Sequence, residues 1–303
     1  MQRIVFASGK GGTGKTTLTA LTARLLADGG EHLALADCDV EAANLPIALR
    51  AEVVSSEPFA GGSKAVIDAE ACHGCGACAL ACRFGALGPS ADYFRAQTYE
   101  LDPWACEGCA ACVSACRYGA ITMVASQAGE VMAAETAPGP MAFGRLAPGE
   151  DLSGKLVTEV RRKTDELAEA RGIERMWIDG PPGVGCPAIA AITGTDLVVG
   201  VTEPTLSGEH DLMRLVTLAR RFKIPVAVVL NKAELSGSGA RLLRERIAAE
   251  GLELIGEIPY DPAVAVMPGL LARGELTAYP EGPGMDAIRS IAAWLAERRS
   301  ARG

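Results

Sequence analysis

Continuous apolar runs separated by amphipathic segments occupy the first and last parts of the chain. The runs at 197–202 and 226–230 lack alternation, which is typical of parallel strands buried on both faces. Shorter runs predict further strands at 3–7, 33–36, 175–179 and 253–258. Helical periodicity predicts helices at 15–28, 153–171, 208–222, 240–250 and 286–302. Strands that alternate with helices predict an α/β fold with a mostly parallel, doubly wound sheet.

The middle of the chain has a different pattern. CHGCGACALACRFGAL at 72–87 is repeated as CEGCAACVSACRYGAI at 106–121, with few long apolar runs around either copy. So short and local a duplication predicts one two-fold module rather than a solenoid. We therefore expect an inserted α+β module at 60–126 that interrupts an α/β domain formed by 1–59 and 127–303.

Composition and charge limit the possible classes of protein. Apolar residues make up 49% and charged residues 22% of the 303 positions, an ordinary globular balance. The net charge of -8 argues against nucleic acid as a partner, because that partner selects a basic face. No apolar run reaches the roughly 18–20 residues that span a bilayer, and no signal segment precedes the first strand. We expect a cytoplasmic protein that binds no membrane.

A glycine-rich loop stands between the first predicted strand and the first helix. It fits the pattern G-x-x-x-x-G-K-[ST], in which backbone N–H groups cradle phosphate. Lys15 is expected to reach the β- and γ-phosphates, and the Thr16 hydroxyl to bind Mg²⁺. The predicted nucleotide contacts are Gly9, Gly11, Gly12, Thr13, Gly14, Lys15, Thr16 and Thr17.

The loop carries a second lysine, Lys10, directly after its first glycine. The run KGGTGKTT resembles the deviant Walker A motif of the MinD, Mrp, ParA and nitrogenase iron protein group. The resemblance implies that Lys10 reaches across an ATP-sandwiched dimer to the partner's phosphates. A second cation there would stabilise the charge that develops on the transferring phosphoryl group. Activity is then expected to depend on dimerisation.

Candidate site residues end or follow four other predicted strands, where ligand sites collect in open α/β sheets. The same resemblance implies that Asp39, in the segment Asp37-Cys38-Asp39, orients or deprotonates the attacking water. Asp179 matches the Walker B carboxylate for Mg²⁺, although an ordinary helix-capping aspartate is the alternative. The family also implies an adenine contact at Asn231, which otherwise is a simple turn residue. Pro259 lies at a similar strand end and is expected to form a wall of the base site.

The two cysteine repeats have the spacing C-x₂-C-x₂-C-x₃-C of two-cluster bacterial ferredoxins, in which the fourth cysteine ligates the other cluster. This predicts one [4Fe–4S] cluster on Cys72, Cys75, Cys78 and Cys116, and a second on Cys106, Cys109, Cys112 and Cys82. Zinc is the alternative, but its sites normally use pairs of cysteines at two separated places. Arg83 and Arg117 follow the fourth cysteines, where ferredoxins usually have proline.

Two cysteines lie outside the repeats. Cys38 is expected to be a small core residue. Cys186 lies seven residues after Asp179, at the offset where the nitrogenase iron protein has a cysteine that ligates a cluster between two subunits. It is a candidate thiolate at a dimer interface, with a small buried loop residue as the alternative.

Taken together, the motifs resemble MinD superfamily P-loop ATPases that contain an inserted ferredoxin domain. The resemblance implies a Mg²⁺-dependent ATPase, slow and stimulated by a partner, that pairs as a homodimer or with a similar subunit. The expected function couples this dimer to electron transfer, or to assembly or delivery of an iron–sulfur or mixed-metal cluster, with a redox or cluster-acceptor protein as partner. The alternative is a positioning or scaffold ATPase in which the clusters are structural.

Overall fold

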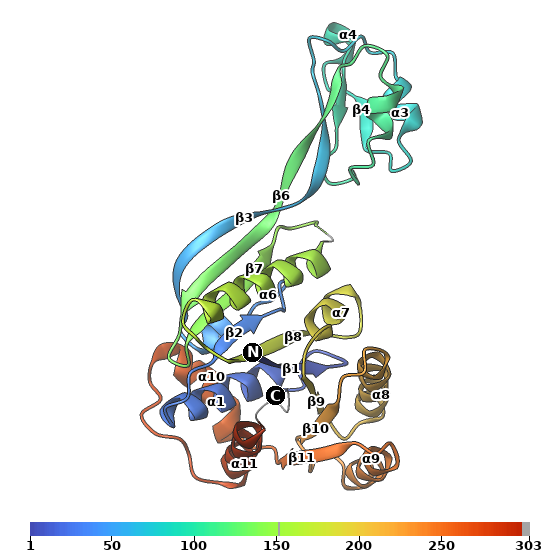
Figure 1. Ribbon diagram of the computed structural model, residues 1–303. Coiled ribbons are helices and arrows are strands. Elements are labelled where there is room, and N and C mark those ends of the chain that lie inside the picture. Colours follow the sequence, from blue (N-terminus) through green and yellow to red (C-terminus); the bar gives the residue numbers. More distant parts are fainter. Residues whose placement is uncertain (151, 299–303) are drawn as a thin grey trace. The chain divides into compact units, whose positions relative to one another are not determined.

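The computed structural model describes residues 1–150 and 152–298, which fold as two compact units (Figure 1). Among the described residues, the first unit contains 1–57, 130–146 and 153–298, and the second contains 58–129, 147–150 and 152. The strands β3 (Glu52–Ile67) and β6 (Ile121–Glu135) each begin in one unit and end in the other.

The first unit is built on a nine-stranded sheet with the order β11-β10-β9-β1-β8-β2-β7-β6-β3. Neighbours from β11 to β7 pair in parallel. The central strands are β1 (Gln2–Ser8), β2 (Ala34–Asp37), β8 (Arg175–Pro182) and β9 (Leu197–Thr202). The outer ones are β7 (Pro140–Leu146), β10 (Val226–Asn231) and β11 (Glu253–Ile258). Consecutive segments of the chain run to opposite sides of β1, so the loop after β1 lies at a topological switch point, where open α/β sheets bind ligands.

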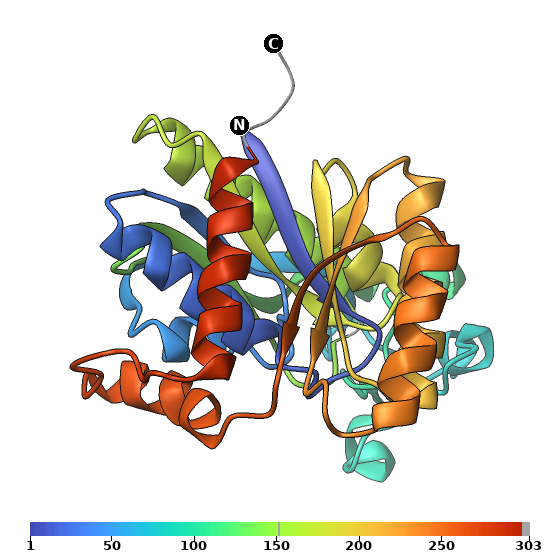
Figure 2. The ribbon, with the colours of Figure 1, turned by 90° about the horizontal axis from the view of Figure 1, so that it is seen from below.

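Helices cover both faces of this sheet (Figures 1 and 2). One face carries α1 (Lys15–Asp28), α2 (Leu45–Ala48), α10 (Pro262–Arg273) and α11 (Pro283–Glu297). The other carries α6 (Ser153–Glu169), α7 (Cys186–Ile192), α8 (Leu206–Arg221) and α9 (Gly237–Ala249). Successive residues of β10 alternate between the cores, since Val229 packs with α10 and α11 and Val228 packs with α8 and α9. Burial on both faces explains why the central strands are continuous apolar runs.

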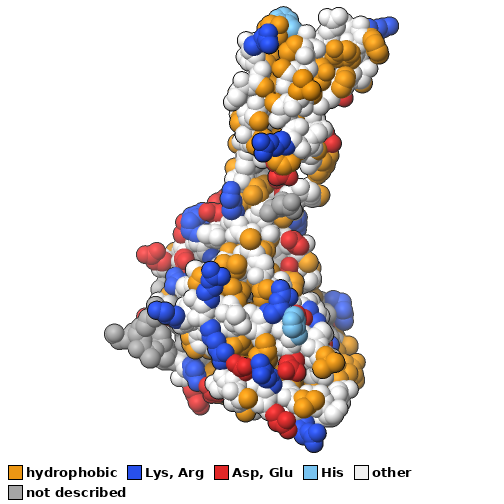
Figure 3. All heavy atoms as spheres, turned by 90° about the vertical axis from the view of Figure 1, so that its right-hand side faces the viewer, with side chains coloured by type: hydrophobic (Ala, Val, Ile, Leu, Met, Phe, Trp, Pro, Cys, Tyr) orange, Lys and Arg blue, Asp and Glu red, His pale blue; other side chains and the backbone are white. Residues whose placement is uncertain are grey.

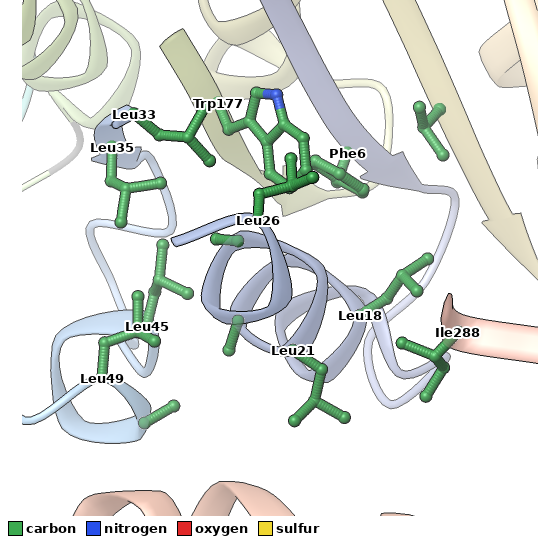
Figure 4. Packing of buried hydrophobic residues seen from close by; sticks show 14 of the residues in the cluster. Phe6, Leu18, Leu21, Leu26, Leu33, Leu35, Leu45, Leu49, Trp177 and Ile288 are labelled. Carbon is green, nitrogen blue, oxygen red and sulfur yellow. The ribbon is translucent and has the colours of Figure 1, made fainter. Parts of the chain in front are cut away.

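The larger core forms around α1 (Figure 4). Leu18, Leu21 and Leu26 point from this helix into the cluster. Trp177 of β8 is fully buried and meets Phe6 edge-on, with ring centroids 5.3 Å apart. This packing fixes α1 against β1 and β8, and therefore fixes the start of α1, where the glycine-rich loop ends.

The second unit has a small core of its own, formed by Ala65, Cys78, Leu87, Cys112 and Ile121. Its elements are α3 (Ala77–Ala81), β4 (Leu87–Pro89), α4 (Tyr93–Ala96), β5 (Tyr99–Leu101) and α5 (Ala111–Ala115). β4 and β5 pair antiparallel, and the two cysteine helices α3 and α5 contact each other. Figure 3 shows hydrophobic side chains gathered on the surface of this unit.

The structure also contains elements that the periodicity does not predict. The predicted strands and helices of the first unit are present, with ends shifted by up to a few residues. Strands β3, β6 and β7 and helices α2, α7 and α10 are additional. The helix predicted at 286–302 is present as α11, which packs on α1 and β11; positions 299–302 lie outside the described residues.

Candidate nucleotide-binding site and cysteine cavities

The glycine-rich loop follows β1 and ends at the first residue of α1. Gly12 and Gly14 adopt φ angles of 78° and 89°, a region that favours glycine. A Cβ atom on Gly14 would lie 2.3 Å from Asn231 Nδ2, and one on Gly9 would lie 2.2 Å from the Cβ of Asp211. The glycines therefore let the loop turn and also let it approach β10 and α8 closely.

A buried cluster joins this loop to β8. Lys15 Nζ lies 3.1 Å from Asp179 Oδ1, and Thr16 Oγ1 donates a 2.6 Å hydrogen bond to Asp179 Oδ2. The side chain of Asp179 is 1% exposed. The helix-capping alternative for Asp179 is wrong, because this residue lies within strand β8. Its carboxylate contacts Lys15 and Thr16, the two residues that the glycine-rich motif predicts to bind phosphate and Mg²⁺.

The end of β2 brings two more carboxylates to the same edge of the sheet. Asp37 pairs in register with Asp179 and accepts hydrogen bonds from the N–H groups of Asp39 and Leu45. Burial first, and then the nearby Asp179 carboxylate, raise the pKa of Asp37 well above its ordinary value. Asp39 is half-buried, and burial also raises its pKa. Asp37 thus holds the backbone that follows β2 through these two hydrogen bonds. Asp39 instead lines a cleft above the glycine-rich loop.

A cleft of about 570 Å³ opens over the loop. Asp39 and residues 11–17 line it, and the opposite wall is formed by residues of α2 and α10. A second cavity of about 200 Å³ shares Gly12, Gly14 and Thr17 with the cleft. Asn231 and Pro259 line this second cavity together with Tyr260. The structure thus places the predicted phosphate residues and the predicted base residues in adjoining spaces.

Asn231 is the last residue of β10, and both polar atoms of its amide form a hydrogen bond. Its Nδ2 donates a 2.7 Å hydrogen bond to the Thr13 carbonyl, and its Oδ1 accepts one from the Lys232 N–H. The side chain therefore ties the glycine-rich loop to the strand end beside the base cavity. Its position differs from that of a simple turn residue.

Lys10 extends away from the cleft floor toward the start of α8. Its Nζ lies 3.3 Å from Glu203 Oε2 and donates to Ser207 Oγ at 3.3 Å. Lys232 Nζ also donates a 2.5 Å hydrogen bond to Glu203 Oε1. The sequence does not predict these ion pairs of Glu203, because Lys10 and Lys232 lie about 190 and 30 residues away from it and no local motif encodes such pairs.

The second unit contains two small, mostly apolar cavities, each of which is lined by four cysteines. The lining cysteines of one are Cys72, Cys75, Cys78 and Cys116. Those of the other are Cys82, Cys106, Cys109 and Cys112. Each set takes three cysteines from one repeat and one from the other. Among residues 1–150 and 152–298, no three His, Cys, Asp or Glu side chains converge as ligands of a single metal ion.

The remaining cysteines differ in exposure. Cys38 is fully buried, as predicted, and burial raises the pKa of its thiol. Cys186 is exposed at the first residue of α7, so the interpretation of Cys186 as a buried loop residue is wrong. In the part of the chain that the structure describes, no helix is both long and apolar enough to cross a bilayer.

Known proteins share this architecture. An uncharacterized protein of Methanocaldococcus jannaschii, MJ0578, is 33% identical over 239 residues, which is 77% of this chain and 78% of that protein. A MinD cell division protein of Aquifex aeolicus superposes with a TM-score of 0.56 at 22% identity and covers 99% of this chain and 98% of its own. The septum site-determining protein MinD of Pyrococcus horikoshii, solved with Mg-ADP, gives 0.54 at 18% identity and covers 98% and 96%.

These structural similarities show the fold, and the match to a family model shows the family. The model for the CobQ/CobB/MinD/ParA nucleotide binding domain matches residues 4–270, which includes the glycine-rich loop, Asp39, Asp179, Asn231 and Pro259. This chain therefore belongs to the CobQ/CobB/MinD/ParA nucleotide-binding family.

Proposed function

We propose that this protein binds and hydrolyses Mg-ATP as a nucleotide-dependent dimer, and that its second unit holds two [4Fe–4S] clusters. The single observation that carries the ATPase proposal is the Lys15–Asp179–Thr16 cluster at the floor of the cleft. Lys15 and Thr16 are both held in place by Asp179. Mg²⁺ and phosphate would therefore bind side chains that are already oriented toward the cleft floor. Lys15 would bind the β- and γ-phosphates, and Thr16 and Asp179 would hold the metal.

Within this proposal, Asp39 orients the attacking water. It lines the cleft on the phosphate side, and its raised pKa brings the carboxyl group closer to the range useful for a general base. Asn231 and Pro259 form walls of the base cavity, and Asn231 also holds the loop through Thr13. The partner in the dimer is a second copy or a similar subunit.

The cysteine cavities support the cluster proposal. Each cavity collects the four cysteines that the ferredoxin spacing predicts for one cluster, including the exchanged fourth ligand. A bound cluster would supply one-electron chemistry, and the mostly apolar walls around it would limit solvent access.

Two uses of ATP remain as candidates. A positioning or scaffold ATPase with structural clusters is the one that the similarity to MinD proteins favours. The two cysteine cavities support the other candidate, in which ATP-dependent pairing gates electron transfer or delivers a metal cluster to an acceptor protein. Exposed apolar side chains on the second unit, Leu80, Phe94 and Trp104, offer a surface for such an acceptor.

The test uses anaerobically purified protein. We expect about eight irons per chain, binding of Mg-ATP by calorimetry, and a mass increase to that of a dimer with a non-hydrolysable ATP analogue but not with ADP. Lys15→Ala is the matched control, which should retain iron and lose nucleotide. Protein without Mg-ATP binding would refute the ATPase proposal, and protein without iron would refute the cluster proposal.

A redox titration separates the two uses of ATP. If pairing gates electron transfer, the cluster midpoints should shift when Mg-ATP is added. Unchanged midpoints in a protein that still forms the ATP-dependent dimer would favour the positioning or scaffold function.

A further inference from the structure

The corner between β9 and α8 holds the second lysine of the glycine-rich loop. Lys10 Nζ lies 3.3 Å from Glu203 Oε2 and 3.3 Å from Ser207 Oγ. The Glu203 side chain is 10% exposed and the Lys10 side chain is 32% exposed. The ammonium group is therefore partly exposed and is paired with a largely buried carboxylate of its own subunit.

Backbone packing keeps this corner close to the loop. A Cβ on Gly9 would overlap Asp211 of α8, and one on Gly208 would lie 2.3 Å from the Glu203 carbonyl oxygen. Thr205 caps α8 by accepting a hydrogen bond from the Gly208 N–H. The carboxylate of Glu203 is thus presented by a rigid turn rather than by a flexible loop.

Glu203 serves two cations. Its other oxygen lies 2.5 Å from Lys232 Nζ, which also donates to the Gly12 carbonyl. Burial raises the pKa of Glu203, but the hydrogen bonds from Lys232 and Lys10 and the charges of these lysines together lower it by more, so the net pKa is lowered. The carboxylate is therefore charged at neutral pH, and its pairing with Lys10 is a genuine ion pair.

We propose that Glu203 is a positioning residue that holds the Lys10 ammonium group on its own subunit, so that ATP-dependent pairing must first release it. The inference rests on the proposed function, because only a paired subunit gives Lys10 a competing anion, the phosphates of the partner's nucleotide. Lys10 cannot occupy both positions, and each Glu203 contact opposes one contact across the dimer. The Glu203–Lys10 contact thereby raises the nucleotide concentration that dimer formation requires.

The first test reports on the contact itself. Lysine footprinting with an amine-acetylating reagent, read by mass spectrometry on nucleotide-free protein, measures the accessibility of Lys10. Glu203→Gln should raise Lys10 labelling at least about 3-fold. A partly exposed ion pair favours the bound position of the lysine by about that factor, and the variant loses this preference. The control is Glu209→Gln, in the first turn of α8 and outside the nucleotide site. This variant should leave the labelling of Lys10 unchanged.

The second test measures pairing. With a non-hydrolysable ATP analogue, Glu203→Gln should lower the dimer dissociation constant about 3- to 10-fold, as two such contacts are released per dimer. A merely structural carboxylate would give the opposite sign, with weaker pairing and a lower melting temperature. If Glu203→Gln folds poorly, Ser207→Ala, which removes only an exposed hydroxyl, should raise Lys10 labelling.

Unchanged Lys10 labelling in both variants, or weaker pairing in a well-folded Glu203→Gln, overturns the inference. A wild-type protein that never pairs refutes the dimer in the proposed function instead, and the footprint still reports on the contact. The two failures are therefore distinguishable.

Discussion

At the scale of single residues, the carboxylates near the cleft have different roles although they lie on adjoining strands. Asp179 is buried and holds Lys15 and Thr16, whereas Asp37 is buried and holds backbone N–H groups. Asp39 alone of the three lines the cleft. Of these three carboxylates, Asp39 is therefore the one to which the proposed function assigns the attacking water.

Asp39→Asn should slow ATP hydrolysis by about 10²-fold or more while ATP still binds, because an amide cannot accept the proton. Burial raises the pKa of Asp39 above the usual value of about 3.9, and the base works only when deprotonated. Wild-type activity should therefore fall, as pH decreases, at a higher pH than an ordinary aspartate would give. Steady-state ATPase profiles check this, and an unaltered rate in the variant would exclude Asp39 as the base.

Asn231→Ala should weaken Mg-ATP binding about 5- to 10-fold, because the loop loses its hydrogen bond from Asn231 Nδ2 to the Thr13 carbonyl. Asn231→Asp keeps the size of the side chain and lacks the donor, so it should weaken binding at least as much. Calorimetric titration with Mg-ATP gives both values. An affinity that stays at the wild-type level in both variants contradicts this role.

At the scale of elements, the short helix α7 depends on its neighbour α6. Arg161 Nη1 donates 2.6 Å hydrogen bonds to the carbonyls of Ala190 and Thr193 at the end of α7. Burial lowers the pKa of the Arg161 guanidinium. Helix α7 follows the loop after β8, so this contact links the Asp179 side of the cleft to the outer helices.

Arg161→Leu should lower the free energy of unfolding by about 1–3 kcal/mol, because two carbonyls lose a charged donor. The matched control is Arg162→Leu, which removes an arginine at the next position that pairs with two exposed glutamates of its own helix. That variant should change stability by less than about 0.5 kcal/mol. Urea unfolding of both proteins measures the difference, and equal losses would contradict the special role of Arg161.

At the scale of the whole molecule, the two cysteine repeats are interdependent. Each cavity takes its fourth cysteine from the other repeat, so neither repeat completes a cavity alone. Helices α3 and α5 contact each other and bring the two sets together. The duplication in the sequence therefore folds as one unit.

Cys82→Ser and Cys116→Ser should each reduce iron from about eight toward about four per chain, and each should remove a different cluster. Cys82→Ser should spare the cluster on the Cys72 set, and Cys116→Ser the cluster on the Cys106 set. Iron analysis with electron paramagnetic resonance of the reduced proteins tests the exchange. If both variants retain the same cluster, the exchanged ligation is wrong.

The sequence by itself determined the parallel α/β pattern, the phosphate loop and the grouping of the cysteines, because local periodicity and fixed spacing encode all three. Strands β3, β6 and β7 escaped prediction because their apolar positions become meaningful only beside their sheet neighbours. Tertiary structure alone decided that Asp37 and Asp179 meet, that Asn231 holds the glycine-rich loop, and that Lys10 rests on Glu203. These contacts join residues far apart in the chain, and their partners are chosen by the order of strands in the sheet, which no local pattern specifies.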